Sequence, residues 1–386
     1  MSIKNICVLT KNYPDPWFIE RGAFLEKLVR IWQSEMVNVD VVAPRSIWNI
    51  IRNIPNGRNT KHSIAGDRLE RPLYLSFSNK TIGKVNFKDI SRNQFLNATY
   101  KAVNNLPTPD LFYGQFLFTG GVAALKLGEK FKKPSFADVG ESSILGRVKN
   151  EKELQLVAST ARSLSGIVCV SEKLKEEMLE LGVNPEKVIY HQNTVNLNRF
   201  CPMDKHKCRE KLNLPKDKKI IIFVGHFIHG KGPLRLLKAI ERLNNPDVKC
   251  LFIGRGSQKP DGNSVLKASP VSNLELPLWL NSADIFVLPT LYEGNCNAIN
   301  EAMACGLPII SSDIPEVKLQ VPVDCGILIN PLDIDELANA IKQLIYDPKM
   351  ISEMGNNALE TQRKNSSKSR PKVILEWMNS MLESAQ

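Results

Sequence analysis

The chain has 386 residues, of which 43% are hydrophobic and 24% are charged, the composition of a folded globular protein. No stretch approaches the roughly 20 apolar residues of a membrane-spanning helix, and the apolar run at the N-terminus is too short for a secretory signal. The net charge is +11. The length favours two domains, and we expect them in the cytoplasm.

The positive charge is concentrated in the first half of the chain. Residues 1–165 contain 24 Lys and Arg against 14 Asp and Glu, and residues 45–101 contain 11 against 3. Large side chains are interleaved with these charges: Trp48, Tyr74, Phe77 and Phe87. Such a surface favours an anionic partner, which could be lipid headgroups at the inner membrane face, a pyrophosphate-linked acceptor or nucleic acid, while a merely solvated basic surface is the alternative. Because no recognised nucleic-acid-binding module accompanies it, we expect no nucleic acid partner.

The first half alternates short apolar runs with amphipathic stretches, which is typical of parallel α/β sheets. Strands are predicted at 4–10, 37–43, 110–113, 134–138, 166–170 and 188–191. Helices are predicted at 22–34, 91–105 and 172–181, and the last of these is capped by Ser171 and ended by Gly182.

The second half repeats this alternation after a polar segment, 193–218, which two prolines interrupt. Strands are predicted at 219–225, 248–253, 284–288, 308–311 and 326–329, and helices at 233–244, 276–282, 299–305 and 333–346. A last helix begins at Pro371 and would pack on the first domain. We therefore expect a first domain of residues 1–200, joined by 371–386, and a second domain of residues 201–370.

The eight cysteines include no C-x-x-C pair, and several lie in apolar runs, as buried thiols in a reducing compartment do. His226 and His229 are three residues apart, but no second pair of ligands accompanies them. We expect neither a disulfide framework nor a metal site.

The segment from Glu293 to Glu301 carries the strongest signal for chemistry. It follows a predicted strand and leads into a predicted helix, whose unpaired N–H groups and partial positive charge favour phosphate. We place Glu293 in the loop and Glu301 on the first turns of the helix, at the two ends of an elongated polyhydroxylated ligand. For Glu301 alone, a capping or dipole-pairing role is about equally probable.

Two glycine turns follow predicted strands in the same half. Gly225 begins a loop that reaches Lys231 at the entrance of a helix, and Arg255 lies between two glycines after the next strand. A glycine lets the backbone approach a ligand closely, and a lysine supplies a point charge for phosphate. Neither turn has the spacing of a P-loop or of G-x-G-x-x-G, and an ordinary turn is the alternative.

The first half offers two weaker candidates. Arg21 and Gly22 start a helix and form a possible anion corner. Asp138 and Glu141 follow a predicted strand, and one of them could orient or deprotonate an acceptor hydroxyl, although loop capping is equally probable for each.

The residues from Glu293 to Pro308 resemble the E-G-x-x-x-x-x-x-E-A-M-A-x-G-x-P motif of glycosyltransferase family 4. Ser171, Gly182 and Lys187 also stand where that family has them, as does the run from Arg199 to Pro202, so the resemblance spans most of the sequence. It implies the GT-B fold, an α/β architecture of two facing Rossmann-like, doubly wound parallel-sheet domains with an interdomain cleft. It also implies transfer of a sugar from a nucleotide diphosphate with retention of the anomeric configuration.

The resemblance further implies residue roles. Glu293 would contact sugar hydroxyls, Glu301 would bond the ribose, and Lys231 would neutralise the departing phosphate without a metal or other cofactor. The diphosphate would lie on the backbone of five residues: Gly294, Asn295, Cys296, Asn297 and Ala298. His226 stands where the family commonly has arginine, and we expect it to help Lys231 stabilise the leaving group as a catalytic residue. The family's histidine-glycine in the first domain is replaced around Asp138 to Gly140.

We therefore expect a glycosyltransferase with a glycan or lipid-linked acceptor, acting in cell-surface polysaccharide or glycolipid synthesis. A nucleotide-sugar epimerase or a phosphorylase of the same fold would use the same donor cleft without an acceptor hydroxyl. A non-catalytic nucleotide-sugar binder is the third possibility, and the presence of Lys231 together with both glutamates disfavours it.

Overall fold

The computed structural model describes residues 2–15, 22–53, 64–77, 81–82, 85–366 and 369–384. The chain divides into two compact units, the first comprising Met1–Gln192 with Arg370–Gln386 and the second Asn193–Ser369. The division falls a few residues before the expected boundary near 200. No helix among the described residues is long and apolar enough to cross a membrane.

A seven-stranded parallel sheet forms the centre of the first unit, in the order β11-β10-β9-β8-β1-β2-β4. Its strands are β1 (Asn5–Leu9), β2 (Asn38–Val42), β4 (Arg68–Glu70), β8 (Leu111–Gln115), β9 (Ser135–Val139), β10 (Gly166–Cys169) and β11 (Val188–Tyr190). The chain builds outward from β1 in both directions, so β1 and β8 flank the point where the strand order reverses. Ligands bind doubly wound sheets at the carboxyl ends of the strands flanking such a switch point.

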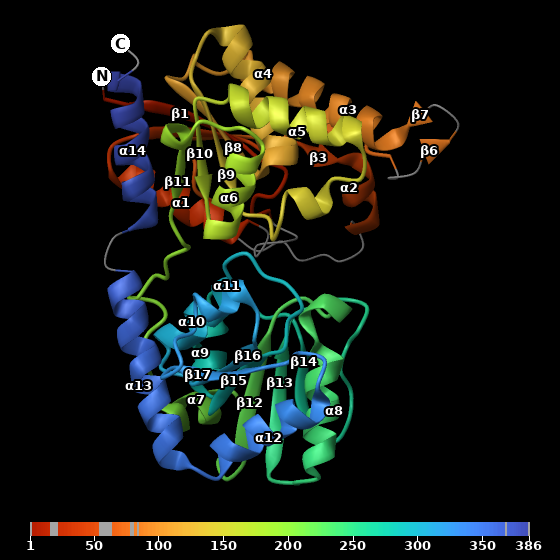
Figure 1. Ribbon diagram of the computed structural model, residues 1–386, viewed down its shortest axis with the longest axis vertical. Helices are drawn as coiled ribbons and strands as arrows, with labels where there is room; N and C mark the ends of the chain where they lie inside the picture. The colour runs from red at the N-terminus through yellow and green to blue at the C-terminus, as the bar shows by residue number, and fades with distance from the viewer. Residues whose placement is uncertain are drawn as a thin grey trace. The chain divides into compact units, whose positions relative to one another are not determined.

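Both faces of this sheet are covered by helices (Figure 1). The helices are α1 (Ala23–Ser34), α2 (Ile47–Asn53), α3 (Phe87–Val103), α4 (Val122–Phe131), α5 (Glu151–Ser163), α6 (Glu172–Glu180) and α14 (Arg370–Ser384). Ile6 and Val8 pack on the face that carries α1 and α14, whereas Cys7 and Leu9 pack with α3 and α4. The strand is therefore apolar throughout, as expected for a sheet buried on both faces.

The closing helix α14 packs on the first unit, where the sequence analysis placed it. Trp32 of α1 donates from Nε1 to the carbonyl of Pro371 at 2.7 Å, and the ring of Trp377 meets Phe136 edge to face. Ser171 caps α6 as predicted, because its Oγ accepts from the N–H of Leu174. Helices α4 and α5 were not predicted.

Four further short strands of this unit are β3 (Arg45–Ser46), β5 (Leu73–Tyr74), β6 (Thr81–Ile82) and β7 (Val85–Asn86). β3 pairs with β5 in parallel, and β6 with β7 in antiparallel. A π-helical turn, η2 (Phe116–Gly121), follows β8 directly, and short 3₁₀ turns are η3 (Leu145–Arg147) and η4 (Pro185–Lys187).

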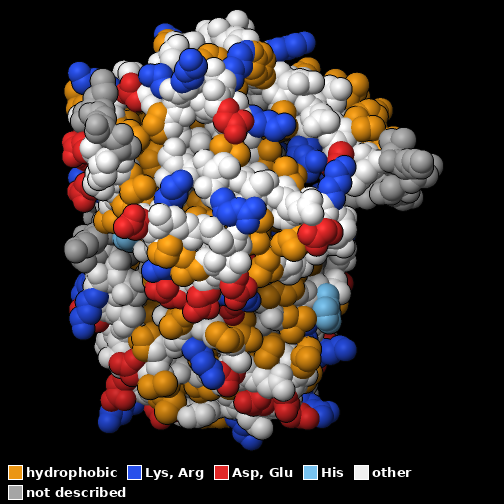
Figure 2. Space-filling model, turned by 45° about the horizontal axis from the view of Figure 1, so that its top comes forward, with side chains coloured by type: hydrophobic (Ala, Val, Ile, Leu, Met, Phe, Trp, Pro, Cys, Tyr) orange, Lys and Arg blue, Asp and Glu red, His pale blue; other side chains and the backbone are white. Residues whose placement is uncertain are grey.

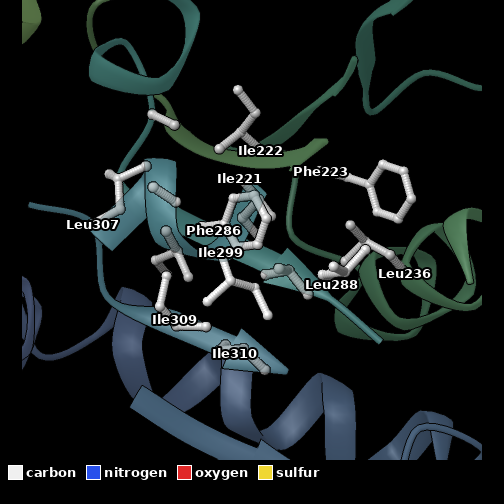
Figure 3. Packing of buried hydrophobic residues seen from close by; sticks show 14 of the residues in the cluster. Ile221, Ile222, Phe223, Leu236, Phe286, Leu288, Ile299, Leu307, Ile309 and Ile310 are labelled. Carbon is white, nitrogen blue, oxygen red and sulfur yellow. The ribbon is translucent and has the colours of Figure 1, made fainter. Parts of the chain in front are cut away.

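A six-stranded parallel sheet forms the second unit, in the order β14-β13-β12-β15-β16-β17. Its strands are β12 (Lys219–Val224), β13 (Val248–Ile253), β14 (Val265–Ser269), β15 (Ile285–Leu288), β16 (Ile309–Ser312) and β17 (Gly326–Ile329). Here the order reverses between β12 and β15. Figure 3 shows side chains of β12, β15 and β16, among them Ile221, Phe286 and Ile309, packed with Ile299 of the following helix.

The helices of the second unit are α7 (Lys205–Lys211), α8 (Pro233–Leu243), α9 (Leu276–Asn281), α10 (Asn297–Ala304), α11 (Pro315–Lys318), α12 (Ile334–Ile345) and α13 (Pro348–Asn365), with a 3₁₀ turn η5 (His229–Lys231) before α8. Helices α7 and α13 were not predicted. α7 carries six charged or polar residues and no apolar stripe, but buried Arg209 donates to Asp284 at 2.7 Å. A contact 75 residues away in sequence therefore fixes this helix.

Candidate functional site

Two loops meet at the switch point of the second unit. The loop after β12 runs through Gly225 to Lys231 and enters α8, and the loop after β15 runs through Glu293 and enters α10. Because β12 and β15 are neighbours in the sheet, both loops leave the same edge side by side. The sequence predicted both loops, and the structure places them together.

Hydrogen bonds fasten the two loops to each other. The N–H of Leu291 donates to the carbonyl of Gly230 at 2.7 Å, and Oγ1 of Thr290 donates to the same oxygen at 3.2 Å. Arg235, buried on α8, donates from Nη1 to the carbonyl of His229 at 2.8 Å and from Nη2 to that of Pro289 at 2.7 Å. One guanidinium thus holds both loops at fixed spacing.

The glycines of the first loop are required by close packing. A Cβ on Gly230 would lie 2.3 Å from Oη of Tyr292. Gly232 has φ of +75°, and a Cβ there would lie 2.4 Å from the carbonyl oxygen of Pro289. The sequence His229-Gly-Lys-Gly232 therefore serves the contact between the loops as well as the turn.

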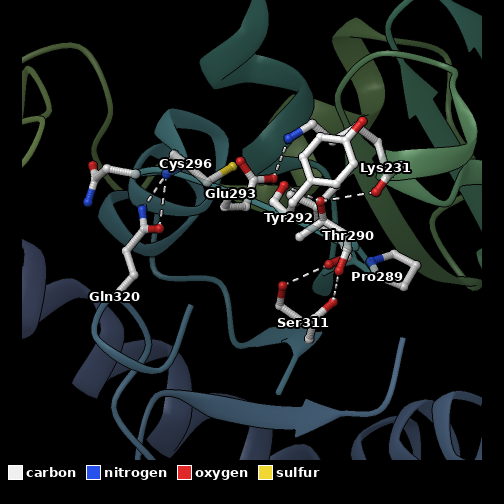
Figure 4. Close-up of polar contacts among 12 residues, drawn as sticks. Lys231, Pro289, Thr290, Tyr292, Glu293, Cys296, Ser311 and Gln320 are labelled. Atoms are coloured by element: carbon white, nitrogen blue, oxygen red, sulfur yellow. Dashed lines mark hydrogen bonds and ion pairs between the residues drawn. The ribbon is translucent and has the colours of Figure 1, made fainter. Parts of the chain in front are cut away.

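Lys231 and Glu293 form an ion pair between these loops, with Nζ and Oε1 2.6 Å apart (Figure 4). Their side chains are 19% and 7% exposed. Burial alone would lower the pKa of Lys231, but the charge of Glu293 outweighs it and the pKa is raised. The lysine is therefore fully charged at neutral pH and is held in one place.

The N-terminus of α10 follows shortly after Glu293 along the chain. Cys296 is its N-cap residue, and no side chain caps the helix by a hydrogen bond. Burial raises the pKa of the Cys296 thiol to about 12, so the thiol is neutral. An uncapped helix start next to a charged lysine is suited to an anion such as a diphosphate.

A buried amide network positions the start of α10. Gln320 accepts from the N–H of Cys296 at 3.0 Å and donates to its carbonyl at 2.6 Å. Asn300 accepts from Gln320 at 2.7 Å and from Gln362 at 3.0 Å, and its Nδ2 donates to Oδ1 of Asn295 at 3.1 Å. Sequence reasoning missed these amides, although a polar Asn300 directly after Ile299 on a buried helix was a usable signal.

The remaining donor-side candidates take up different positions. Glu301 lies partly exposed on the second turn of α10, and His226 is exposed in the loop after β12. Arg255 is half-buried after β13, and its carbonyl accepts from the N–H of Phe227 at 2.7 Å. A Cβ on Gly254 would lie 1.9 Å from the carbonyl oxygen of Gly225, so the loops after β12 and β13 are also in contact.

Asp138 in the first unit is fully engaged in a structural contact. Arg370 of α14 donates to both of its oxygens, at 2.9 and 3.0 Å, and Oη of Tyr113 donates to Oδ2 at 3.1 Å. The carboxylate is only 2% exposed. Asp138 therefore anchors the closing helix, and both of its oxygens accept hydrogen bonds. Its role toward an acceptor hydroxyl stays a prediction.

Glu141, three residues later, differs from Asp138. Its Oε1 accepts from the N–H of Leu117 in η2 at 3.1 Å, but its buried Oε2 has no partner. Burial raises the pKa of Glu141 to about 7. A buried carboxyl with an unpaired oxygen at the carboxyl end of β9 is a candidate for binding a hydroxyl group.

Gln115, at the end of β8, was not predicted as a site residue. Its Oε1 accepts from Oγ1 of Thr10 at 2.5 Å, directly beyond β1, while its buried Nε2 has no partner. The side chain therefore lies at the switch point of the first sheet.

Gly22, predicted for the donor side, precedes α1 with φ of +71°, and a Cβ added there would lie 2.1 Å from the carbonyl oxygen of Asn12. Its neighbour Arg21 lies outside the described residues.

No group of three or more potential metal ligands occurs among the residues that the structure describes. All eight cysteines are free, and seven of them are buried. The reading of the cysteines as separate, mostly buried thiols is confirmed.

Comparison with known proteins identifies the second unit. Residues 204–361 match the family described as glycosyl transferases group 1. TuaC of Bacillus subtilis (strain 168), named as a glycosyltransferase of teichuronic acid biosynthesis, is 25% identical over 92% of this chain and 92% of its own length.

Two further similarities bear on the chain. UDP-Gal:alpha-D-GlcNAc-diphosphoundecaprenol alpha-1,3-galactosyltransferase of Escherichia coli is 31% identical over 51% of this chain, which matches 55% of that protein. The solved structure of sucrose-phosphate synthase from Thermosynechococcus elongatus superposes with a TM-score of 0.78 at 18% identity, covering 99% of this chain and 100% of the other. That likeness supports the expected GT-B fold for both parallel-sheet units.

Proposed function

Since residues 204–361 match the family of glycosyl transferases group 1, we propose that the switch point of the second unit binds the diphosphate of a nucleotide sugar. The protein is a glycosyltransferase, and its donor is a nucleotide sugar. The observation that carries the placement is the Lys231–Glu293 pair, 2.6 Å apart, beside the uncapped start of α10.

The chemistry fits these groups. When a sugar leaves its diphosphate, positive charge develops at the anomeric carbon and negative charge on the leaving oxygen. Lys231 and the backbone from Gly294 to Ala298 supply positive potential for that oxygen, and the loop contacts hold them in place beforehand. A contact of this kind in a water-poor site contributes about 3 kcal/mol, or roughly a hundredfold in rate.

Two carboxylates take the remaining donor contacts in this proposal. Glu293 accepts hydrogen bonds from hydroxyls of the transferred sugar and keeps Lys231 charged. Glu301 accepts hydrogen bonds from the ribose hydroxyls. Arg255 and His226 lie at the same sheet edge and border the nucleotide.

Because Lys231 neutralises the leaving group, transfer proceeds without a divalent metal. Activity that persists in excess EDTA supports this point, and activity that requires added magnesium or manganese contradicts it.

The acceptor contacts are assigned to the first unit. Nε2 of Gln115 and Oε2 of Glu141 are buried and unpaired at the carboxyl ends of β8 and β9. An amide donor and a carboxyl group suit a hydroxyl, which both donates and accepts. We propose that they orient the acceptor hydroxyl, that the configuration at the transferred carbon is retained, and that Asp138 takes no direct part.

The relatives' names suggest the acceptor class. TuaC is named for a cell-surface polymer and the Escherichia coli enzyme for a diphosphate-linked lipid. We propose a glycan or lipid-linked acceptor in cell-surface polysaccharide or glycolipid synthesis, met at the inner face of an anionic membrane. The basic excess of residues 45–101 favours such a surface.

One experiment separates this function from its alternatives. The purified protein is first screened with UDP, GDP and ADP sugars for a rise in melting temperature, since a bound ligand stabilises by mass action. The stabilising donor, carrying a radiolabel, is then incubated with lipid and glycan acceptors. A labelled glycosidic product is expected. An altered free nucleotide sugar indicates an epimerase, a sugar phosphate formed in a parallel incubation with inorganic phosphate indicates a phosphorylase, and unchanged donor indicates a binder. Each of these results contradicts the proposal.

The matched control for the donor site is an exposed lysine on the adjacent helix. Lys231→Ala removes the buried charge, whereas Lys238→Ala removes a charge from the solvent-exposed side of α8. We expect the donor-induced rise in melting temperature to be lost only in Lys231→Ala. Equal behaviour of the two variants contradicts the assignment.

A further inference from the structure

We propose that a group of five exposed apolar side chains on the first unit docks the protein on an anionic lipid surface. We call them the apolar patch: Trp48, Ile51, Leu73, Leu75 and Phe77. Each is between 41% and 55% exposed. Single exposed apolar residues need no explanation, but a group in one region of the surface marks an interaction site.

The structure brings the two halves of the patch together. β3 pairs with β5 in parallel, and α2 continues from β3 while residues 75–77 continue from β5. Oγ of Ser46 and Oγ of Ser76 are 2.5 Å apart, which fixes the two continuations side by side. The exposed residues of α2 and of 73–77 therefore share one region of the surface.

In this region, apolar side chains point outward at positions where polar side chains usually face the solvent. Leu73, Leu75 and Phe77 alternate outward along an extended segment, while Tyr74 between them is buried against Phe95. Trp48 and Ile51 are three residues apart on α2, so they occupy one face of that helix. The extended segment thus buries Tyr74 and presents apolar side chains outward, and α2 adds the exposed Trp48 and Ile51.

Charge and residue type favour an anionic lipid surface as the partner of the apolar patch. Residues 45–101 carry 11 basic against 3 acidic residues, which suits anionic headgroups, and each Lys or Arg near such a surface contributes about 1 kcal/mol. On the face drawn in Figure 2, basic side chains are scattered among apolar and uncharged ones and form no single basic surface. The dispersed basic charge attracts the protein to the membrane, and the apolar patch then makes the direct contact with the lipid.

Trp48 suits a lipid surface, because tryptophan favours the headgroup region. The seven residues of α2 are far too few to span a bilayer, so the helix would lie in the interface. This inference extends the proposed function by naming the surface on which a lipid-linked acceptor is reached. Docking itself does not depend on transfer.

Vesicle flotation tests the inference. Wild-type protein and a Trp48→Ser/Phe77→Ser variant are floated with vesicles of phosphatidylcholine and phosphatidylglycerol, and with phosphatidylcholine alone. The control is Leu274→Ser/Leu332→Ser, which removes two apolar residues that are even more exposed, 68% and 63%, from the second unit. We expect wild type and control to float with the anionic vesicles and the patch variant to lose roughly tenfold in partition coefficient.

Salt separates the two contributions. Raising salt from about 50 to about 500 mM should weaken binding of all three proteins, and the variant should stay weaker than the control at both concentrations. Absence of wild-type flotation, or a variant that floats like the control, overturns the inference. So does sedimentation showing a wild-type dimer that the variant loses, since a second copy would then cover the patch. The rise in melting temperature with nucleotide sugar, measured on the same samples, reports the donor site independently.

Discussion

The two sheets reverse their strand order in the same way, yet they carry opposite kinds of polar group at the reversal. In the second unit, Lys231 and Glu293 are paired at 2.6 Å and the loops that carry them are joined by hydrogen bonds. In the first unit, Nε2 of Gln115 and Oε2 of Glu141 are buried without partners. In the proposed function, the same topology thus provides a preformed charged site for an anion in one unit and a site with unsatisfied polar groups for hydroxyls in the other.

The difference matters for catalysis because the two sites differ in how ligand binding affects their free energy. A paired lysine retains its charge in the absence of ligand, so the donor site needs little rearrangement when a diphosphate arrives. An unpaired buried amide or carboxyl destabilises the ligand-free protein and recovers that free energy when a ligand supplies the missing hydrogen bond. We therefore expect mutations in the second unit to reduce turnover and mutations of the unpaired groups in the first to change stability as well.

The largest expected effect is the loss of Lys231. Lys231→Ala removes the charge opposite the leaving phosphate and should lower kcat by roughly a hundredfold. It also leaves the buried Glu293 carboxylate without its partner, so the melting temperature should fall while the protein still folds. Steady-state kinetics with the stabilising donor measure it, and Lys238→Ala on the exposed side of α8 is the control. A kcat within a factor of two of wild type would place the leaving group elsewhere.

Glu141→Gln should affect stability in a pH-dependent way. The pKa of Glu141 is raised to about 7, so the folded protein favours the protonated carboxyl, and stability is lost as pH rises from the ordinary glutamate range to about 7. The glutamine keeps the neutral form at every pH, and it should stabilise the protein by up to about 3 kcal/mol at pH 8 and negligibly near pH 4.

Urea unfolding at the two pH values measures this difference. Asp138→Asn is the contrasting variant, because it weakens a contact with buried Arg370 and should destabilise the protein at pH 8. If Glu141→Gln is destabilising at pH 8, the carboxyl is a structural partner like Asp138, and the contrast between the two residues disappears.

A smaller effect is expected at Arg235. Arg235→Lys retains a charge but cannot donate to the carbonyls of His229 and Pro289 in the same fork geometry, so the two loops should separate slightly. We expect roughly a tenfold loss of kcat, since modest displacement of a catalytic group is costly. Lys231 in this variant should also respond more strongly to salt. Wild-type kinetics at every salt concentration would show that the loops keep their spacing without Arg235.

The site of the second unit was easier to predict from the sequence than that of the first unit, because the signals in the second unit lie close together in the sequence. Lys219–Val224 is an apolar run that ends in a glycine loop, and Glu293 to Pro308 forms one continuous motif, so strand, loop and helix could be predicted from neighbouring residues. Their pairing across two loops followed only from the strand order. Helix α7 was missed because it has no apolar stripe and depends on Asp284, which lies far along the chain.

The carboxylates of the first unit show why the rest could not be predicted. Asp138 and Glu141 end the same strand and looked equivalent in the sequence. Arg370, 232 residues after Asp138 in the sequence, donates to both oxygens of that carboxylate, whereas one oxygen of Glu141 has no partner. Gln115 carried no motif at all, and only the reversal between β1 and β8 marks its position.

The most direct measurement is calorimetric titration of one nucleoside and its diphosphate, chosen by the thermal screen, into wild type and Lys231→Ala. The diphosphate should bind wild type far more tightly than the nucleoside does. In the variant the affinity for the diphosphate should fall at least tenfold, while that for the nucleoside stays unchanged. Equal diphosphate affinity in the two proteins would contradict the placement of the donor at Lys231 and the start of α10.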